Sequence, residues 1–434
     1  MINFHQAIFR AGVAIRNRQI PSHRAFLLES QWWSLEKLRE WQESLLREIV
    51  QNAYEHSVFY RVKFDDSGLE PQQIKTLDDL ASLPILEKNE ILSERDRLQI
   101  RDGGERLFYS ETSGSTGNPL VFYRNADWDA WHNASVMRGY EWHGVRPWER
   151  NGYLWGFNFS PSQRLKTRAL DALQNRFRMF SYDDDEIASF AGKLRHAVYL
   201  GGYSSMIYEI AKAINRNPRI EPLTNLKLIR GTSEKIFERY QQEAVQAFGR
   251  RIVSEYGAAE SGIIAFECPE GSMHVNMETC IVEVENGEIL VTNLVSRSFP
   301  IIRYRLGDSI VLDREMKCAC GRAHPVIREV TGRIGKRIVG KSRSFPSLTL
   351  YYVFKNLARK HDLVLNYQGV QEQAGVLRLD IEEKVSSETR VLLLGECEAY
   401  YGKDVDVEIR ESCNLRSQGR KKRDFVSSID DGVS

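Results

Sequence analysis

The chain reads Thr112-Ser113-Gly114-Ser115-Thr116-Gly117-Asn118-Pro119 just ahead of the apolar segment Leu120-Val121-Phe122-Tyr123. Small, hydroxyl-bearing and turn-forming residues in a row offer little to a packed core. Glycine lets backbone amides turn toward an anion without a Cβ in the way, and serine and threonine hydroxyls add donors. A solvated linker has a similar composition, but this run is short and leads into a strand-like segment. The stretch therefore predicts a loop that binds a polyphosphate.

Two common phosphate motifs do not fit this loop. A P-loop NTPase needs G-x-x-x-x-G-K-[ST], and a dinucleotide-binding turn needs G-x-G-x-x-G after a strand. No lysine follows Gly117 directly. A positive charge for the phosphates would therefore come from another part of the chain.

Composition narrows the classes of function. The 434 residues predict about two to three domains, and 42% hydrophobic with 27% charged residues is ordinary for a globular protein. A net charge of +1 gives no case for nucleic acid as a partner. No apolar run approaches the ~18 residues that span a bilayer, and arginines interrupt the segment 1–20 where a signal peptide would be apolar. We expect a cytoplasmic protein with small-molecule partners.

The order of predicted elements indicates an α/β protein. Residues 1–100 form a helical leader, because apolar residues recur at three- and four-residue spacing between charged ones. From 110 to 330, apolar strand segments alternate with amphipathic helices, which predicts layers around a mostly parallel sheet. The segment Ile281–Thr292, with Asn286-Gly287 at its centre, predicts a hairpin and the start of an antiparallel section.

The pattern resets after about Gly332. A helix over Leu348–Lys360, two strands, a second helix over Thr389–Tyr401 and a last strand indicate a compact α+β lobe. We therefore predict a large N-terminal unit, 1–332, and a small C-terminal unit, 333–434.

Three further motifs follow the loop along the chain. They are Tyr256-Gly257-Ala258-Ala259-Glu260, Tyr304-Arg305-Leu306-Gly307-Asp308 and Gly332-Arg333-Ile334-Gly335-Lys336. Each is weak alone, but in this order the four resemble the phosphate loop, the Y-G-x-[ST]-E motif, the Y-x-x-G-D motif and the G-R hinge of the adenylate-forming enzymes. Leu83-Pro84-Ile85-Leu86-Glu87-Lys88 and Phe299–Arg305 resemble the phenylacetate-CoA ligase and CapK-type branch. The resemblance covers nearly the whole chain.

The resemblance implies a fold and a reaction. The fold is a large, multi-lobed adenylate-forming domain with a small mobile domain that turns about a hinge near Gly335. The reaction joins a carboxylic acid to ATP, releases pyrophosphate, and passes the acyl group from the acyl-adenylate to coenzyme A. Two alternatives stay open: an amine or hydroxyl acceptor, as in surface polysaccharide biosynthesis, and a degenerate nucleotide-binding homologue. The oligomeric state is also open, a homodimer being one option.

The same resemblance implies a nucleotide site. The loop would hold the β and γ phosphates, Glu260 would bind Mg²⁺, Asp308 would accept hydrogen bonds from the ribose, and Arg333 would contact the ribose or steady the hinge. The complete implied set is Thr112, Ser113, Gly114, Ser115, Thr116, Gly117, Ser233, Glu234, Tyr256, Gly257, Ala258, Asp308 and Arg333.

The catalytic lysine of the family has an ambiguous counterpart in this sequence. Counting forward from Gly419 gives Arg420, whereas counting back from Phe425 gives Lys421. Ammonium and guanidinium groups are not interchangeable at such a site. A solvated basic tail is the alternative, and we favour Lys421 as catalytic. Ala259 also departs from the family, since a hydroxyl residue usually precedes the motif's glutamate.

Aromatic residues predict the acyl pocket. Trp155, Phe157 and Tyr203 lie near the expected cleft and could line an apolar acid site. Aromatic residues of this kind are as often plain core.

Four residues form a candidate metal site. Cys268, His274, Cys318 and Cys320 supply three thiols and one imidazole, a set typical of a closed, structural zinc site. The spacings C-x5-H and C-x-C are less specific than C-x2-C, so four buried, inert groups are the alternative. Members of the CapK-like branch resemble this chain here, which favours the zinc site. We interpret His324 as a surface residue.

Overall fold

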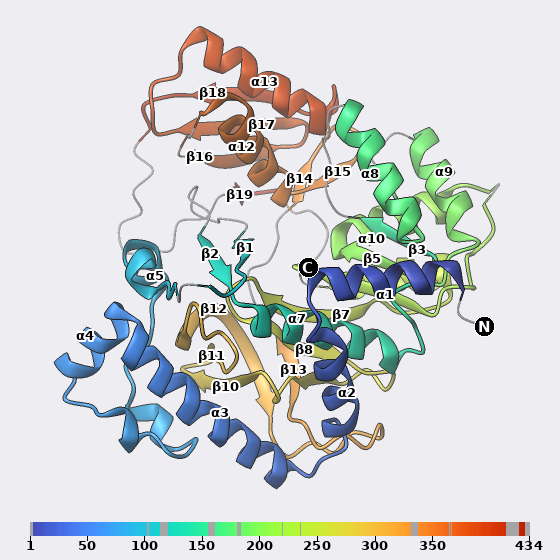
Figure 1. Ribbon diagram of the computed structural model, residues 1–434. Coiled ribbons are helices and arrows are strands. Elements are labelled where there is room, and N and C mark those ends of the chain that lie inside the picture. Colours follow the sequence, from blue (N-terminus) through green and yellow to red (C-terminus); the bar gives the residue numbers. More distant parts are fainter. Residues whose placement is uncertain are drawn as a thin grey trace.

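The computed structural model describes residues 3–101, 104–112, 120–154, 161–179, 184–218, 220–234, 236–330, 337–363, 365, 367–413 and 425–429. These form an α/β protein with a large sheet and a separate C-terminal sheet (Figure 1). None of the helices in these ranges combines the length and the hydrophobicity needed to cross a bilayer.

The N-terminal part is helical, as predicted. Its elements are α1 (Phe4–Arg16), α2 (Ile20–Ser30), α3 (Leu35–His56), α4 (Val58–Asp66), η1 (Pro71–Gln73), η2 (Asp79–Ser82), α5 (Lys88–Ser93) and α6 (Arg95–Leu98). Helix α3 begins where the Ser34 side chain accepts a hydrogen bond from the backbone N–H of Lys37. Its buried residues recur at helical spacing and join the main core. The leader is thus packed onto the large sheet.

The large sheet has eleven strands in the order β10-β11-β12-β13-β9-β8-β7-β6-β5-β3-β4. Their bounds are β3 (Asn151–Leu154), β4 (Arg176–Arg178), β5 (Tyr199–Tyr203), β6 (Leu228–Thr232), β7 (Val253–Ala258), β8 (Gly262–Glu267), β9 (Met273–Val275), β10 (Cys280–Glu285), β11 (Glu288–Asn293), β12 (Ile301–Asp313) and β13 (Val326–Val330). Strands β4, β3, β5, β6 and β7 are parallel to one another. From β7 to β8 onward the pairs are antiparallel.

This arrangement corrects one expectation. The sheet is not mostly parallel, and its antiparallel part begins at the β7–β8 pair, before the predicted hairpin. The hairpin itself is confirmed: β10 and β11 pair from Glu285 and Glu288, and Asn286 and Gly287 both have positive φ, 53° and 81°. Two central residues with positive φ are the mark of the tight turn that this dipeptide favours.

Helices cover both faces of the parallel half. They are α7 (Ala126–Trp142), α8 (Pro161–Leu173), α9 (Asp184–Leu194), α10 (Ser204–Arg216) and α11 (Glu238–Phe248). Residues of α9, α10 and α11 share one core cluster with β5 and β6. Helix α7 packs on the other face through Tyr140, beside Tyr199, Val253 and Phe266.

A small hairpin carries the predicted phosphate loop. Strands β1 (Phe108–Glu111) and β2 (Val121–Arg124) are antiparallel. The backbone N–H of Thr112 donates to the Leu120 carbonyl, and the Leu120 N–H donates to Thr112 Oγ1, both at 3.0 Å. Thr112 and Leu120, which flank the predicted loop, are therefore held together.

The C-terminal unit has its own sheet and core. Its elements are β14 (Arg337–Val339), β15 (Ser344–Pro346), α12 (Leu348–His361), β16 (Tyr367–Gln373), β17 (Val376–Ile381), α13 (Ser387–Tyr401), β18 (Asp406–Arg410) and β19 (Phe425–Ser427). The four-stranded sheet has the order β18-β17-β16-β19, and both helices contribute to one core with it. In Figure 1 this unit, in orange and red, lies at the opposite end of the molecule from α3 and α4. Both predicted helices are confirmed; the predicted boundary at 332/333 lies outside the described residues.

Candidate active site and candidate metal centre

A cleft of about 1020 Å³ opens at the carboxyl ends of β5, β6 and β7. Ligands of open α/β sheets bind at this edge. Every described residue of the predicted nucleotide and acyl sets lines it, namely Thr112, Tyr203, Ser233, Glu234, Tyr256, Gly257, Ala258, Glu260 and Asp308. Residues far apart in the sequence therefore meet in one site.

A hydrogen bond joins two of the sequence motifs. The Tyr256 hydroxyl on β7 donates to Asp308 Oδ2 on β12 at 2.9 Å. Gly307 holds φ at 82°, a value that favours glycine, and so turns the chain just before the carboxylate. A Cβ on Gly257 would lie 2.4 Å from the Gly262 carbonyl oxygen, so glycine is needed where β7 and β8 approach. Glycine is therefore required at both motif positions by the local backbone conformation or packing.

Glu260 lies in the turn between β7 and β8. Its carboxylate is buried at the edge of the cleft with 7% of the residue exposed. The Tyr304 hydroxyl donates to Glu260 Oε1 at 3.1 Å, which fixes the side chain. A carboxylate oriented in this way is a suitable ligand for Mg²⁺.

Ser233 and Glu234 follow β6 at the cleft. Ser233 has φ of 69°, an uncommon value for a residue with a side chain. The Glu234 carboxylate accepts a hydrogen bond from the Ser205 backbone N–H at 2.9 Å, at the start of α10. Burial raises the pKa of Glu234, and hydrogen bonds from Ser205 oppose that rise. The helix start thus holds this segment in place.

The C-terminal unit reaches the cleft through α12. Lys355 pairs with Glu111, and the Tyr352 hydroxyl bonds that of Tyr203; all four residues line the cleft. Arg337 pairs with Glu209 of α10. Sequence reasoning missed this contact, because nothing in the local pattern of α12 distinguishes its cleft-facing residues.

Several predicted residues lie outside the described part of the chain. They are Ser113, Gly114, Ser115, Thr116, Gly117, Trp155, Phe157, Arg333, Arg420 and Lys421. Their roles stay predictions.

Sequence reasoning also missed an ion pair in the cleft. Arg230 on β6 and Glu255 on β7 both line it. A signal was present, since a charged residue interrupts the apolar segment Leu228-Ile229-Arg230 and another directly precedes Tyr256.

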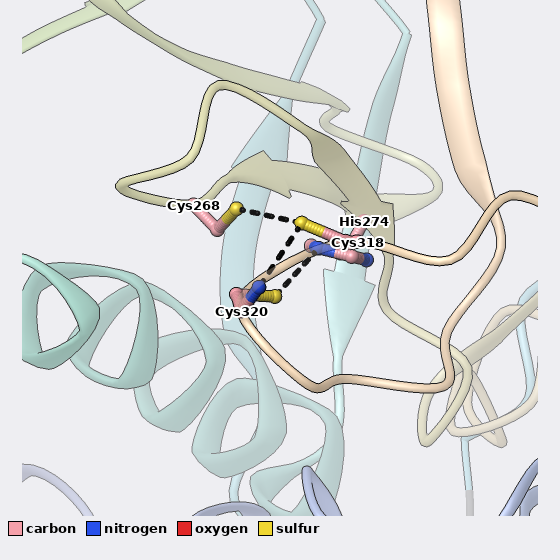
Figure 2. A group of neighbouring side chains, drawn as sticks. All are labelled: Cys268, His274, Cys318 and Cys320. Carbon is pink, nitrogen blue, oxygen red and sulfur yellow. Dashed lines mark hydrogen bonds between the residues drawn. The ribbon is translucent and has the colours of Figure 1, made fainter.

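The four candidate metal ligands converge (Figure 2). Cys268 follows β8, His274 lies on β9, and Cys318 and Cys320 lie between β12 and β13. Their ligand atoms are all within 4.8 Å of one another. Two sulfur ligands of a tetrahedral zinc, each about 2.3 Å from the metal, are about 3.8 Å apart; Cys268 Sγ and Cys318 Sγ lie 3.7 Å apart. The donor set fits zinc in both chemistry and spacing.

Neighbouring groups orient the imidazole ligand. His274 Nδ1 lies 3.1 Å from the His324 carbonyl oxygen, and Nε2 lies 3.2 Å from Cys320 Sγ. Donation from Nδ1–H leaves the Nε2 lone pair toward the thiols, as metal-binding histidines require. Burial lowers the pKa of His274 to about 4, so the ring is neutral at pH 7.

A buried polar network packs beside the candidate metal centre. Glu278 is fully buried, and its Oε1 lies 2.6 Å from Arg138 Nη1 and 3.3 Å from His324 Nε2. Burial would raise the pKa of Glu278, but Arg138 and His324 outweigh it and lower that pKa. His324 is thus buried, with 1% exposed, and the expectation of a surface residue is wrong. Burial of His324 is favourable because its Nε2 pairs with Glu278, a residue distant in sequence.

Known proteins resemble this chain over most of its length. CapK of Staphylococcus aureus is 25% identical over 322 residues, covering 71% of this chain and 69% of CapK. The phenylacetate-coenzyme A ligase of Pseudomonas putida is 25% identical over 439 residues, covering 94% of this chain and 90% of that ligase. No model of a protein family matches the sequence.

Solved structures show the same fold. The crystal structure of 2-hydroxyisobutyryl-CoA ligase with 2-HIB-AMP and CoA, in the thioesterification state, has a TM-score of 0.64 at 18% identity. It covers 92% of this chain and 91% of the ligase chain. The chain is thus similar to CapK and to phenylacetate-CoA ligases over most of its length, and it shares the fold of a CoA ligase. Three of the relatives are named phenylacetate-coenzyme A ligases, which are acid–thiol ligases.

Proposed function

We propose that the protein activates a carboxylic acid with ATP and passes the acyl group to coenzyme A. In the first step a carboxylate oxygen attacks the α-phosphorus of ATP, and pyrophosphate leaves with the electron pair of the broken P–O bond. In the second step the thiol sulfur replaces AMP at the acyl carbon. The observation that carries the proposal is the convergence of Tyr256, Glu260 and Asp308 on one cleft beside Ser233 and Glu234.

The proposal gives each described residue a task. Asp308, held by Tyr256, accepts hydrogen bonds from the ribose hydroxyls. The backbone of Ser233 and Glu234 lies beside the adenine, and the loop that begins at Thr112 donates to the β and γ phosphates. Such chemistry depends on positioning and on neutralising developing charge.

Glu260 would hold the magnesium ion. When bound, Mg²⁺ neutralises phosphate charge and orients the reacting groups. The chain's own contribution is the hydrogen bond from Tyr304, which presents one fixed carboxylate at the cleft.

The C-terminal unit would complete the site. We propose units at 1–332 and 333–434 that turn about a hinge near Gly335, so that Lys421, in preference to Arg420, reaches the α-phosphate during adenylation. The contacts of α12 at Glu111 and Tyr203 support a C-terminal unit that bears directly on the cleft. Rotation of such a unit would present different faces for the two steps.

A second acceptor is supported by one observation, the likeness to CapK over 71% of the chain. In that version the acyl group passes to an amine or hydroxyl in surface polysaccharide synthesis. Both versions share the adenylate and place the enzyme in the cytoplasm with its small-molecule substrates.

ATP–pyrophosphate exchange tests the shared step. Purified protein, Mg²⁺, ATP and labelled pyrophosphate are incubated with each of a panel of carboxylic acids; acid-dependent exchange is expected, and its absence for every acid would contradict adenylation. The Asp308→Ala variant should lose exchange. Adding coenzyme A should then give a thioester, whereas exchange without a thioester would favour the second acceptor.

We further propose that Cys268, His274, Cys318 and Cys320 hold a structural zinc. All four positions of a tetrahedron are filled by protein groups, so the ion has no open position for substrate. Zinc there would tie the end of β8 to the β12–β13 connection and so steady the strands that carry Glu260 and Asp308. Elemental analysis after chelator-free purification should give about one zinc per chain; no zinc would contradict the site.

A further inference from the structure

A buried ion pair lies in the wall of the cleft. Arg230 Nη1 donates to both Oε1 and Oε2 of Glu255, each at 3.0 Å. The two residues are 8% and 7% exposed, yet both line the cleft. A buried ion pair is weak evidence for a stabilising role, because desolvation offsets its attraction. Its position at the cleft points instead to a ligand.

Among the described residues, one donor of Arg230 has no partner. In the part of the chain that the structure describes, its Nε is buried and has no hydrogen-bond partner. Gly201, the neighbour of Arg230 in register on β5, has no side chain there, and a Cβ would lie 3.3 Å from both Nε and Nη2. Buried donors are nearly always satisfied in folded proteins. A ligand atom is the natural partner for this one.

The pair lies where the acyl chain of an activated acid would run. Arg230 is two residues before Thr232 at the end of β6, and Glu255 directly precedes Tyr256 on β7. Arg230 lies two residues and Glu255 three residues before the ends of their strands, where the nucleotide residues gather, which is about 7–10 Å at about 3.3 Å per residue. A carboxylate that meets ATP at this edge would therefore direct the rest of its chain toward the pair.

A neutral polar side chain lines the cleft near the pair. His132 on α7 lines the same cleft, and its buried Nδ1 also has no hydrogen-bond partner among the described residues. Burial lowers the pKa of His132 to about 3, so it is neutral. Burial also disfavours the guanidinium charge of Arg230, but Glu255 outweighs it and keeps the pKa of Arg230 above its usual value. The pair is therefore a fixed donor beside a fixed acceptor.

This chemistry selects one class of substituent. A hydroxyl group accepts a hydrogen bond from Arg230 and donates one to Glu255. A second carboxylate would be repelled by Glu255, and a hydrocarbon would leave both groups unsatisfied. We propose that Arg230 and Glu255 recognise a hydroxyl group on the acyl chain, so that the substrates are hydroxylated carboxylic acids. This inference rests on the proposed adenylation and names its substrate class.

Matched acids test the inference in the unmodified enzyme. ATP–pyrophosphate exchange is measured with 4-hydroxyphenylacetate against phenylacetate, 3-hydroxybutyrate against butyrate, and 4-hydroxybutyrate against butyrate. A site built to bond a hydroxyl rejects the analogue that lacks it, so kcat/KM should favour at least one hydroxylated member by about 100-fold or more. Equal use of the members of every pair would overturn the inference while leaving adenylation intact. No exchange with any acid would overturn both.

Variants assign the preference to the pair. The double variant Arg230→Met with Glu255→Gln keeps side-chain volume but removes both charges, and the preference should fall below about 10-fold. The matched control is Arg297→Met with Glu48→Gln, which removes an exposed ion pair far from the cleft and should keep the full preference. ATP binding reports whether each variant is folded, and Glu255→Gln alone, the smaller change, should also reduce the preference. A double variant that is folded and keeps the preference would overturn the assignment.

Discussion

Removal of one buried hydroxyl tests how Glu260 is held. Tyr304 is 1% exposed, and its hydroxyl donates to Glu260 Oε1 at 3.1 Å. Phenylalanine keeps the ring packing and deletes only the hydroxyl. A hydrogen bond to a charged group contributes about 1.5–3 kcal/mol, which corresponds to a factor of about 10–150 in rate if the bond is needed to present the carboxylate. Tyr304→Phe should lower exchange by that factor, and higher Mg²⁺ should restore part of the loss.

A second tyrosine supplies the control. Tyr60 is 3% exposed, and its hydroxyl donates to the Pro300 carbonyl and accepts from the Ile302 N–H, at 3.2 and 3.1 Å. Tyr60→Phe therefore removes hydrogen bonds to Pro300 and Ile302, at the start of β12, without touching Glu260. Both variants should lower the melting temperature, but only Tyr304→Phe should change the Mg²⁺ dependence of exchange. The same Mg²⁺ dependence in both variants would refute the role given to Glu260.

Three further outcomes are expected. Cys320→Ser should lose the bound zinc and lower the melting temperature, whereas Cys397→Ser, at a buried cysteine outside the cluster, should keep the zinc; elemental analysis of both variants decides. Gly202→Ala should destabilise by about 1–3 kcal/mol or more in denaturant unfolding, because its Cβ would lie 2.4 Å from Leu154 Cβ; no loss would mean that β3 and β5 are further apart. Glu278 has a lowered pKa in the folded protein, so its stabilisation is complete above the unfolded value of about 4.3 and is lost as the pH falls below it. Glu278→Gln should be less stable at pH 7 and should show a shallower loss of stability in acid than the unmodified protein.

The sequence predicted those helices and turns that depend on residues close together in the chain. Apolar residues at helical spacing, among them Leu38, Leu45 and Ile49, predicted the helical leader that contains α3, and Asn286-Gly287 predicted the β10–β11 turn. Such local patterns do not determine whether two strands pair in parallel or antiparallel. The antiparallel start at β7–β8 depends on the turn around Glu260, which sequence reasoning treated only as a functional motif.

In the candidate site, too, local motifs were predictable from the sequence, whereas long-range partners were not. The motifs predicted Tyr256, Glu260 and Asp308, and the structure brings these residues to one cleft. The partners that orient them, such as Tyr304 for Glu260, come from pairs 44 residues or more apart in sequence. Arg230 was missed for a similar reason, since a charge in an apolar strand becomes informative only once its partner and the cleft are seen.

Transfer of oxygen from the acid to AMP tests the central claim most directly. An acid labelled with ¹⁸O in both carboxylate oxygens is incubated with the enzyme, ATP, Mg²⁺ and coenzyme A, and AMP is analysed by mass spectrometry. Attack of the carboxylate on the α-phosphorus predicts one labelled oxygen in each AMP formed. Label-free AMP, or ADP and phosphate in place of AMP and pyrophosphate, would contradict an acyl-adenylate.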